Sequence, residues 1–262
     1  MKKRKKRAKI QLYDVLIVLV RLVFFLFFPA LFSSAFTGVK EIITSISGLK
    51  ELEWTAFTAT LVLLLGVTMC FGRIFCGFAC AFGTYGDFLY FLSSWVRKKR
   101  GKQPLRVFSR WQAALKYFKY AVLLAVLILC VLELSGVVSA NSPWTAFSLF
   151  HGGKLPDSKI AVSLLGAISL GMLLEPRFFC RFLCPMGAVF AMMPVLPWAV
   201  VKRDREACLK GCSLCRRTCP AAIEIPDASE EEAEMGECFA CRKCVRKCPK
   251  KNIYTCGNAG KR

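Results

Sequence analysis

Two cysteine runs near the C-terminal end of the chain have residue types and spacing suited to iron–sulfur chemistry. The sequence holds fifteen cysteines, and eight of them form two runs of four, each ending in Cys-Pro. The first run is Cys208, Cys212, Cys215 and Cys219, and the second is Cys238, Cys241, Cys244 and Cys248. A cubane [4Fe–4S] cluster needs four thiolates, which three close cysteines and one distant cysteine can supply. The tail therefore predicts two such clusters.

In two-cluster ferredoxins the last cysteine of each run binds the other cluster, which predicts the ligand sets here. One set is Cys208, Cys212, Cys215 and Cys248; the other is Cys238, Cys241, Cys244 and Cys219. Zinc is disfavoured because its sites use two cysteine pairs with a longer gap, and disulfides are disfavoured on the cytoplasmic side. The apolar pieces 221–225 and 252–254 are expected to cover the clusters.

A second cysteine set lies in an internal repeat. Residues 73–83 recur as 177–187 with identity at six of eleven positions, and Trp-Thr-Ala-Phe at 54–57 recurs at 144–147. The repeated cysteines are Cys76, Cys80, Cys180 and Cys184. Three interpretations stay open: a shared metal or iron–sulfur centre, thiol pairs that cycle with disulfides or bind a soft ion such as Cu(I), or apolar packing of helix ends.

The elements that must position these cysteines are helices of a membrane protein. The chain is 55% hydrophobic with a mean hydropathy of +0.46. Four apolar runs, at 15–36, 56–75, 120–140 and 160–174, approach the roughly 20 residues that a membrane span requires. The predicted fold is an α-helical membrane protein, with four transmembrane helices as a two-fold internal repeat and a small α+β two-cluster ferredoxin domain. The stretches 82–95 and 186–201 are expected to be interfacial or re-entrant.

The charge distribution predicts which side of the membrane the tail occupies. The net charge of +21 is concentrated in three basic segments, 1–9, 97–119 and 202–262. Because Lys/Arg-rich short loops stay in the cytoplasm, both termini are predicted to be cytoplasmic in a multi-pass protein of a bacterial or archaeal inner membrane. The basic segments lie beside apolar runs, so membrane lipid is the expected partner and nucleic acid is not.

These patterns predict six consecutive regions. They are a basic N-terminus (1–12), membrane repeat 1 (13–96), a basic linker (97–117), membrane repeat 2 (118–201), the ferredoxin domain (202–256) and a tail (257–262).

Other residues of interest allow two interpretations each. Arg21 lies inside the first span, about 10 Å along the helix from Asp14, and either pairs with Glu133 or extends to the interface. Arg73 and Arg177 flank the repeated cysteines, either as interfacial anchors or to neutralise a centre. Cys70, Cys130 and Cys256 match no ligand pattern, and His151, the only histidine, is placed in an outer loop.

Four spans, two Cys-x3-Cys motifs and a two-cluster tail together resemble the NapH-type membrane polyferredoxins, to which the C-terminal part of NosR and the CcoG-type proteins are related. The resemblance covers roughly residues 8–255. It departs at Ala81, where the family usually has proline, whereas Pro185 is kept.

The resemblance implies electron transfer between quinol or a cytoplasmic donor and a membrane or extracytoplasmic redox partner. The chain is then a carrier or subunit of an oxidoreductase system. One alternative is a metal- or thiol-handling maturation reductase of the CcoG type that uses the Cys-x3-Cys pairs. Another is a redox sensor or scaffold. No motif identifies a quinone site.

Overall fold

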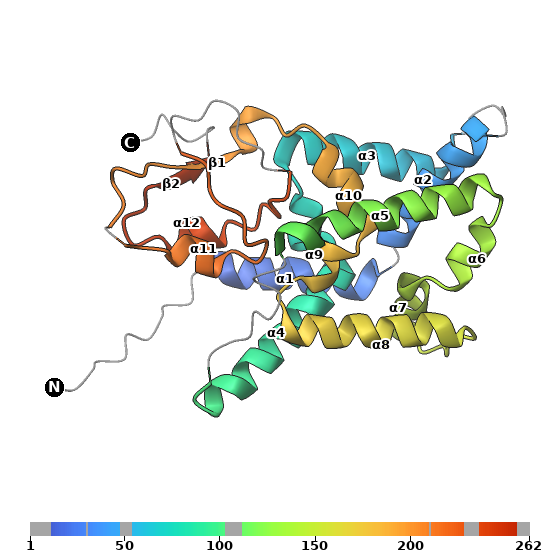
Figure 1. Cartoon of the computed structure of the whole chain (residues 1–262), viewed down its shortest axis with the longest axis horizontal. Helices are drawn as coiled ribbons and strands as arrows, with labels where there is room; N and C mark the ends of the chain where they lie inside the picture. Colours follow the sequence, from blue (N-terminus) through green and yellow to red (C-terminus); the bar gives the residue numbers. More distant parts are fainter. Residues whose placement is uncertain are drawn as a thin grey trace.

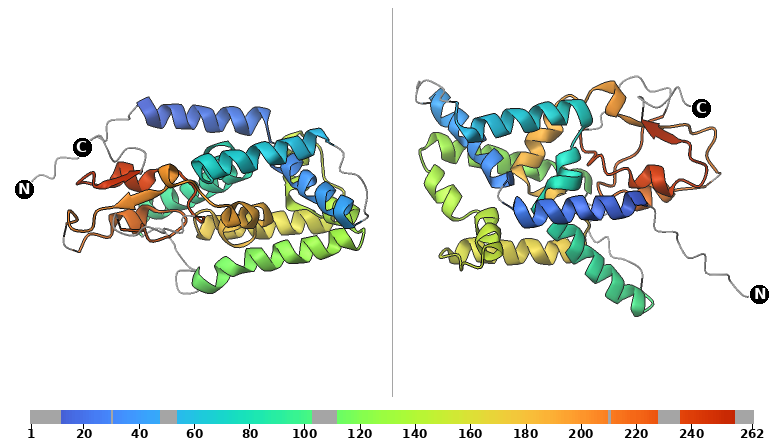
Figure 2. Two further views of the ribbon diagram at one scale, coloured as in Figure 1. Left: turned by 90° about the horizontal axis from the view of Figure 1, so that it is seen from above. Right: turned by 180° about the vertical axis from the view of Figure 1, so that it is seen from behind.

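The computed structural model describes residues 12–29, 31–47, 54–102, 112–209, 211–227 and 236–255. Asp14's side chain, Cys256, the basic segment 1–9 and the tail 257–262 lie outside what is described. The longer helices run roughly along one direction and form an elongated body, with a small mixed region at one end of it (Figure 1, Figure 2).

The elements of the helical body follow in chain order. They are α1 (Leu12–Phe27), α2 (Leu31–Ser47), α3 (Ala56–Phe71), the π-helix η1 (Phe75–Ala79), α4 (Ala81–Lys99), α5 (Gln112–Val131), α6 (Ser135–Ala140), α7 (Pro143–His151), α8 (Lys159–Leu174), α9 (Phe178–Phe182), α10 (Pro185–Met192) and the 3-10 helix η3 (Pro197–Ala199).

Two predicted spans are interrupted helices. The run 15–36 divides into α1 and α2 at Pro29, since proline lacks the N–H that a continuing helix needs. The run 120–140 divides into α5 and α6 at a turn where Glu133 adopts a left-handed backbone with φ of 61°. Each of these two apolar runs therefore forms two helices.

The other two predicted spans form shorter helices. The predicted span 56–75 forms α3, which ends at Phe71. It ends there because Gly72 takes φ of 71° and donates its N–H to the Thr68 carbonyl. The fourth, α8, begins after Ser158, whose hydroxyl accepts a hydrogen bond from the Ala161 N–H.

Membrane-spanning capacity is clearest in α5. Its segment Ala114–Val131 has a mean hydropathy of 2.0 and is long and apolar enough to cross a bilayer; within the described residues it alone meets both criteria. Shorter apolar helices occupy Val15–Phe27, Ala56–Phe71 and Lys159–Leu174.

The two stretches expected to be interfacial differ from one another. Residues 82–95 lie in α4, a regular helix of 19 residues that packs along α8. Residues 186–201 are divided by Pro194 and Pro197 into α10, η3 and the start of a strand. The first therefore contributes to the helical body, and the second connects that body to the cysteine-rich region.

The repeated sequences correspond at their cysteines but not at Trp-Thr-Ala-Phe. In the first copy these residues lead directly into α3, whereas Trp144 begins a separate short helix, α7. Ser142 caps α7, with Pro143 in its first turn, and Gly152 and Gly153 follow its end. The two copies of this tetrapeptide therefore lie in different structural settings.

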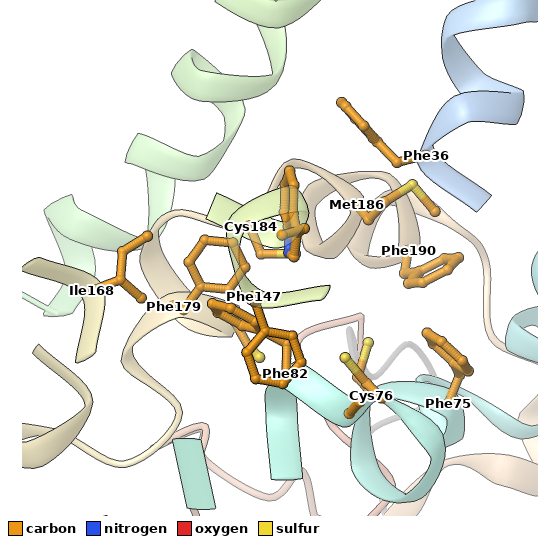
Figure 3. Packing of buried hydrophobic residues seen from close by; sticks show 14 of the residues in the cluster. Phe36, Phe75, Cys76, Phe82, Phe147, Ile168, Phe179, Cys184, Met186 and Phe190 are labelled. Carbon is orange, nitrogen blue, oxygen red and sulfur yellow. The ribbon is translucent and has the colours of Figure 1, made fainter. Parts of the chain in front are cut away.

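The core of the body gathers around the repeated cysteines. Phe82, Phe147 and Phe179 lie close together in the same buried cluster as Cys76 and Cys184 (Figure 3). The ring centroid of Phe82 lies 5.2 Å from that of Phe147 and 4.8 Å from that of Phe179. Such edge-to-face contacts are favourable beyond the area that they bury, so the rings fix the two cysteine-bearing turns relative to each other.

The two ends of the cysteine-rich region pair with each other in a small β-sheet. Strand β1 (Val201–Arg203) pairs antiparallel with β2 (Ile253–Thr255), with Lys202 opposite Tyr254. Between them lie two short helices, α11 (Leu214–Thr218) and α12 (Lys243–Lys247). Val201, Ile225 and Ile253 form a small separate core that packs against several of the cysteines.

The close approach of the tail to η1 depends on Gly77, and this contact generates a prediction. A Cβ at Gly77 would overlap the Phe239 carbonyl oxygen. We expect Gly77→Ala to push the tail away and to destabilise the protein by about 1–3 kcal/mol, the usual cost of overpacking. Limited proteolysis and thermal unfolding of the purified chain measure this effect.

Gly66→Ala is the matched control, because a Cβ there meets nothing within 4 Å and alanine favours the helix. Equal protease resistance of the tail in both variants would contradict the packing argument.

Candidate iron–sulfur and thiol sites

The four cysteines predicted to bind one cluster line a single enclosed cavity. Its walls combine the last cysteine of the first run with the first three of the second: Cys219, Cys238, Cys241 and Cys244. Val201, Ile223 and Ile225 supply apolar walls of the same cavity. The chain thus brings thiols from both runs together in the crossed arrangement expected from the spacing.

Burial governs the chemistry of these thiols. It raises the pKa of Cys238 to about 12. It also raises the pKa of Cys244 to about 12, and the neighbouring Cys241 and Cys219 add to the shift because another negative charge nearby is unfavourable. Thiolates in this cavity therefore need positive charge among them, which iron ions supply.

One asparagine links the first and last cysteines of the other predicted set. The Asn252 side-chain nitrogen donates to Cys208 Sγ at 3.2 Å and to the Asp204 carbonyl at 2.8 Å. The Cys248 thiol donates to the oxygen of the same amide at 2.7 Å. Asn252 is 4% exposed, so a buried polar contact holds Cys208 and Cys248 together across the two runs.

The remaining two cysteines of that set lie further out. Cys215 accepts a hydrogen bond from Arg203 Nη1 at 3.8 Å, and Cys212 is exposed. The predicted ligand set that contains Cys208 and Cys212 is consequently more open to solvent than the cavity around Cys238.

In neither of the two predicted ligand sets do the cysteine side chains surround a single metal ion. Across the described part of the chain, no group of three or more His, Cys, Asp or Glu side chains lies close enough to hold a metal ion. A cubane keeps its thiolates further apart than a mononuclear site does, because four iron ions lie between them. The crossed pairing, the apolar walls and the all-thiol donor set therefore fit a cubane.

The repeated motifs and the tail share one local backbone. The last cysteine of each repeated motif and of each tail run has φ between −72° and −67° and ψ between 112° and 119°. These residues are Cys80, Cys184, Cys219 and Cys248. A five-residue helix that contains the preceding cysteine ends directly before Cys80, Cys219 and Cys248, and one residue separates such a helix from Cys184. Ala81 permits the same turn as proline does.

The four repeated cysteines converge inside the helical body. Cys76, Cys80, Cys180 and Cys184 are all buried in one core cluster. Burial raises the pKa of the Cys80 thiol, and the charges of Cys180 and Cys76 raise it further. Thiols of both repeats therefore lie in the same buried cluster.

The turns that hold these cysteines are each closed by a glycine. The Gly83 N–H donates to Cys80 Sγ at 3.4 Å, and the Gly187 N–H donates to Cys184 Sγ at 3.1 Å. A Cβ at Gly187 would lie 2.9 Å from Arg73 Nη2, and a Cβ at Gly83 would crowd Arg177. Each repeat's arginine therefore reaches into the turn of the other repeat.

Arg177 anchors one side of this junction through Asp87. Its Nε donates to Asp87 Oδ1 and its Nη2 to Oδ2, both at 2.8 Å. It also donates to the Cys76 carbonyl, while Arg21 Nη1 donates to Asp87 Oδ2 at 3.0 Å. Burial alone would raise the pKa of Asp87, but the Arg177 charge and hydrogen bonds hold that pKa well below its usual range.

Arg73 anchors the other side through Glu237 of the tail. Arg73 Nη1 lies 3.2 Å from Glu237 Oε2, and Lys119 Nζ contacts Oε1. The side chains of Arg73 and Lys119 are both 0% exposed. The interpretation of Arg73 and Arg177 as interfacial anchors was wrong, since both lie inside the protein.

Phe239 joins the two arginines. The Arg73 guanidinium lies 4.9 Å from the ring centroid and the Arg177 guanidinium 5.6 Å, within range for cation–π attraction. Cys238 stands between Glu237 and Phe239 in the chain. The contacts that dock the tail therefore place the Cys238 cavity, rather than the more open Cys208 set, beside the four repeated cysteines.

Two of these docking residues could be noticed in the sequence. Asp87 stands out as a carboxylate in the apolar stretch 82–95, and Glu237 precedes a predicted ligand. The pairing of Asp87 with Arg177 and Arg21 was missed, because Arg21 and Asp87 lie in different helices, α1 and α4, and Arg177 stands in the turn before α9. Arg21 does not pair with Glu133, which is exposed at its turn.

The other predicted residues lie apart from the junction. Cys130 is buried at 1% exposure, and Cys70 is half-buried with its carbonyl accepting from Trp198 Nε1 at 2.7 Å. His151 ends α7 instead of lying in a loop.

Comparisons with known proteins agree with this geometry. A family model described as a 4Fe-4S binding domain matches residues 54–103 and 160–202, which contain the four repeated cysteines. The ferredoxin-type protein NapH of Haemophilus influenzae is 23% identical over 185 residues, 68% of this chain and 60% of that protein. The predicted resemblance to the NapH-type polyferredoxins is therefore confirmed. No solved structure matches the chain.

Two further relatives of this ferredoxin-type chain are more similar. The uncharacterized protein MJ0749 of Methanocaldococcus jannaschii is 31% identical over 179 residues, 68% of this chain and 62% of that protein. The putative electron transport protein YccM of Escherichia coli is 26% identical over 227 residues, 80% and 61% respectively. The chain thus spans about three fifths of the length of each of the three relatives named.

The Asp87 network generates a second prediction. Asp87→Asn keeps the shape of the side chain but leaves Arg177 and Arg21 without a carboxylate. Removing one partner of a buried ion pair typically costs about 3–5 kcal/mol, and the partial exposure of Asp87 places the expected loss at the lower end. Thermal unfolding in detergent measures it.

The exposed Asp157 offers a control, and Asp157→Asn should leave the melting temperature unchanged. A melting temperature for Asp87→Asn equal to that of the control would show that the network is not a major source of stability.

Proposed function

We propose that the chain is a membrane-bound electron-transfer protein that carries two [4Fe–4S] clusters in its tail. The observation that supports this most strongly is the single cavity lined by Cys219 together with Cys238, Cys241 and Cys244. The second cluster takes Cys208, Cys212, Cys215 and Cys248, where Asn252 already links the outermost pair.

Each cubane, when bound, accepts or releases one electron, and the protein adjusts how readily it does so. Cationic side chains near a cluster favour its reduced, more negative form. Arg203 beside Cys215, and Arg73 and Arg177 around Phe239, are cations of this kind. Ile225 and Ile253 exclude water from the ligands.

We place the chain in a bacterial or archaeal inner membrane, as a multi-pass protein with both termini in the cytoplasm. Helices α1, α3, α5 and α8 are the spans in this arrangement. The helices α3 and α8 have 16 residues each, about 24 Å at 1.5 Å per residue. A short apolar helix can span by local thinning of the bilayer. The exposed apolar side chains Leu63, Leu124 and Leu170 support contact with lipid.

The two clusters have different neighbours in this proposal. The Cys238 cluster lies against the helical body, and the Cys208 cluster, with exposed Cys212, is open to a redox partner protein. Electrons pass between quinol or a cytoplasmic donor and a membrane or extracytoplasmic partner.

Iron counting tests both the cofactor and the crossed pairing. Protein purified without oxygen should contain roughly eight irons per chain, the content of two cubanes, and give S = 1/2 signals after reduction. The double variant Cys219→Ala/Cys238→Ala removes two ligands of one proposed cluster, so about half of the iron should stay.

The matched pair is Cys248→Ala/Cys238→Ala, which removes one ligand from each proposed cluster and should lose most of the iron. Cys70→Ala controls for the loss of a thiol outside both sets. Iron near zero with stoichiometric zinc in the unmutated protein would reject the function, and the opposite result for the two double variants would reject the crossed pairing.

A maturation reductase that handles a metal or thiol at the repeated cysteines is the second candidate. Two observations favour it: the four thiols converge, and Arg73 has two buried N–H groups, Nε and Nη2, without a hydrogen-bond partner in the described residues. Arg73 Nη2 lies beside the turn that holds Cys184, where a Cβ at Gly187 would come within 2.9 Å of it. Thiolates around a metal or iron–sulfur centre would supply the missing acceptors.

Replacing Cys76, Cys80, Cys180 and Cys184 together by alanine separates the two candidates. A maturation reductase should lose reduction of Cu(II), while the tail keeps its iron. A simple electron carrier should keep both reduction of the tail and electron delivery to its partner. Optical spectra during anaerobic titration with dithionite, and with Cu(II) as acceptor, distinguish these outcomes.

A further inference from the structure

The second half of α4 projects from the helical body, whereas its first half is held firmly. A Cβ at Gly86 would lie 3.1 Å from the sulfur of Met172 in α8, and Asp87 pairs with Arg21 of α1 and with Arg177. Beyond these contacts α4 diverges from the neighbouring helices toward its C-terminal end (Figure 1, Figure 2). The Asp87 network therefore fixes the base from which the rest of α4 extends.

Four large apolar side chains form a stripe along the projecting half of α4. They are Phe88, Phe91, Leu92 and Trp95, and their exposed fractions are 61%, 66%, 43% and 47%. Side chains three, four and seven positions apart lie on one face of a helix. The described residues leave this face largely uncovered, which is typical of a surface that binds a partner or a membrane.

Five cations directly follow the apolar stripe, and three of them form the last turn of α4. They are Arg97, Lys98, Lys99, Arg100 and Lys102. The ion pairs among the described residues include none of the five. Because the sequence has no acidic residue between positions 97 and 119, this positive charge is not balanced locally and attracts anions.

Trp95 joins the stripe to the cations. Lys99 Nζ lies 3.8 Å from the centroid of the Trp95 ring, one turn further along the same face, within range for cation–π attraction. Tryptophan is enriched where hydrocarbon meets water at a membrane surface. The sequence of apolar stripe, tryptophan and cations along α4 therefore matches the order of hydrocarbon, interface and phosphate groups in a bilayer.

We propose that the projecting half of α4 binds anionic phospholipid, with the stripe against acyl chains and the cations against phosphate groups. A basic segment beside an apolar helix face gains both hydrophobic and electrostatic attraction to such a membrane. The inference rests on the proposed membrane arrangement, in which the end of α4 lies on the cytoplasmic side, where anionic lipids are concentrated. An acidic protein or a nucleic acid would pair with the cations but leave the stripe in water.

Quenching of Trp95 fluorescence tests which lipid α4 selects. The full chain is placed in nanodiscs with equal amounts of phosphatidylglycerol and phosphatidylcholine, and one of the two carries bromine on its acyl chains. The Trp95 signal is the difference between the unmutated chain and Trp95→Phe, normalised to nanodiscs without bromine. Brominated phosphatidylglycerol should quench this signal more strongly than brominated phosphatidylcholine, because the cations concentrate the anionic lipid at the helix.

Replacing three cations tests whether charge produces the preference. Lys98→Gln/Lys99→Gln/Arg100→Gln should lower the preference by about fivefold or more, since one cation near an anionic surface contributes roughly that factor. Lys98→Arg/Lys99→Arg/Arg100→Lys is the matched control, because it keeps every charge and should keep the preference. Equal quenching by the two lipids in the unmutated chain, or an unchanged preference in the glutamine variant, would overturn the proposal.

Phe88→Asn/Phe91→Asn tests the apolar stripe. Quenching of Trp95 by both brominated lipids should fall, because the helix face no longer enters the hydrocarbon, while thermal unfolding confirms that the variant is folded. Leu155→Asn is the control, since Leu155 is 84% exposed and lies between α7 and α8. Unchanged quenching in the double variant would contradict the proposal. Trp95 shielded from both lipids in the unmutated chain, as by a protein partner or a second copy, would contradict it as well.

The outcomes separate this proposal from the proposed function. A chain that holds iron and enters nanodiscs but shows no lipid preference at Trp95 contradicts only the role of α4. A chain without iron contradicts the electron-transfer function, whichever lipid surrounds α4.

Discussion

The burial of two arginines at the junction between the repeats is the constraint on which the rest of the structure depends. A guanidinium inside a protein is stable only when carboxylates, carbonyls or rings replace its water. Arg177 obtains Asp87 and the Cys76 carbonyl, and Arg73 obtains Glu237 of the tail. Because Phe239 lies against both guanidinium groups, satisfying them also fixes the tail on the helical body.

This constraint links stability to the proposed function. Glu237 and Phe239, which contact the buried arginines, flank Cys238. The contacts that stabilise the buried cations therefore also bring the Cys238 set beside the four repeated thiols. Gly77 and Gly236 are needed for this approach, since a Cβ at either position would overlap the backbone of the opposing segment. The other set stays open at Cys212. The tail therefore has an inner and an outer cysteine set.

The two kinds of cysteine site differ in polarity while sharing a local turn. In the tail, each Cys-x3-Cys unit packs against a small core that includes Ile225 and Ile253. In the helical body, the same turn places Cys80 and Cys184 among aromatic rings, with an arginine from the opposite repeat at each glycine. One backbone conformation thus serves both sites, and the surrounding side chains determine the environment of the thiols.

The sequence by itself determined the local features: the two cysteine runs, whose spacing predicts the crossed pairing, the repeat of residues 73–83 at 177–187, and apolar helices around 56–71 and 159–174. These follow from spacing and composition within short segments. Only the tertiary structure decided where charges pair, because Arg21, Asp87 and Arg177 lie on different elements. It also decided that Pro29 and Glu133 interrupt predicted spans. Such contacts depend on how helices pack, which the periodicity of one segment does not specify.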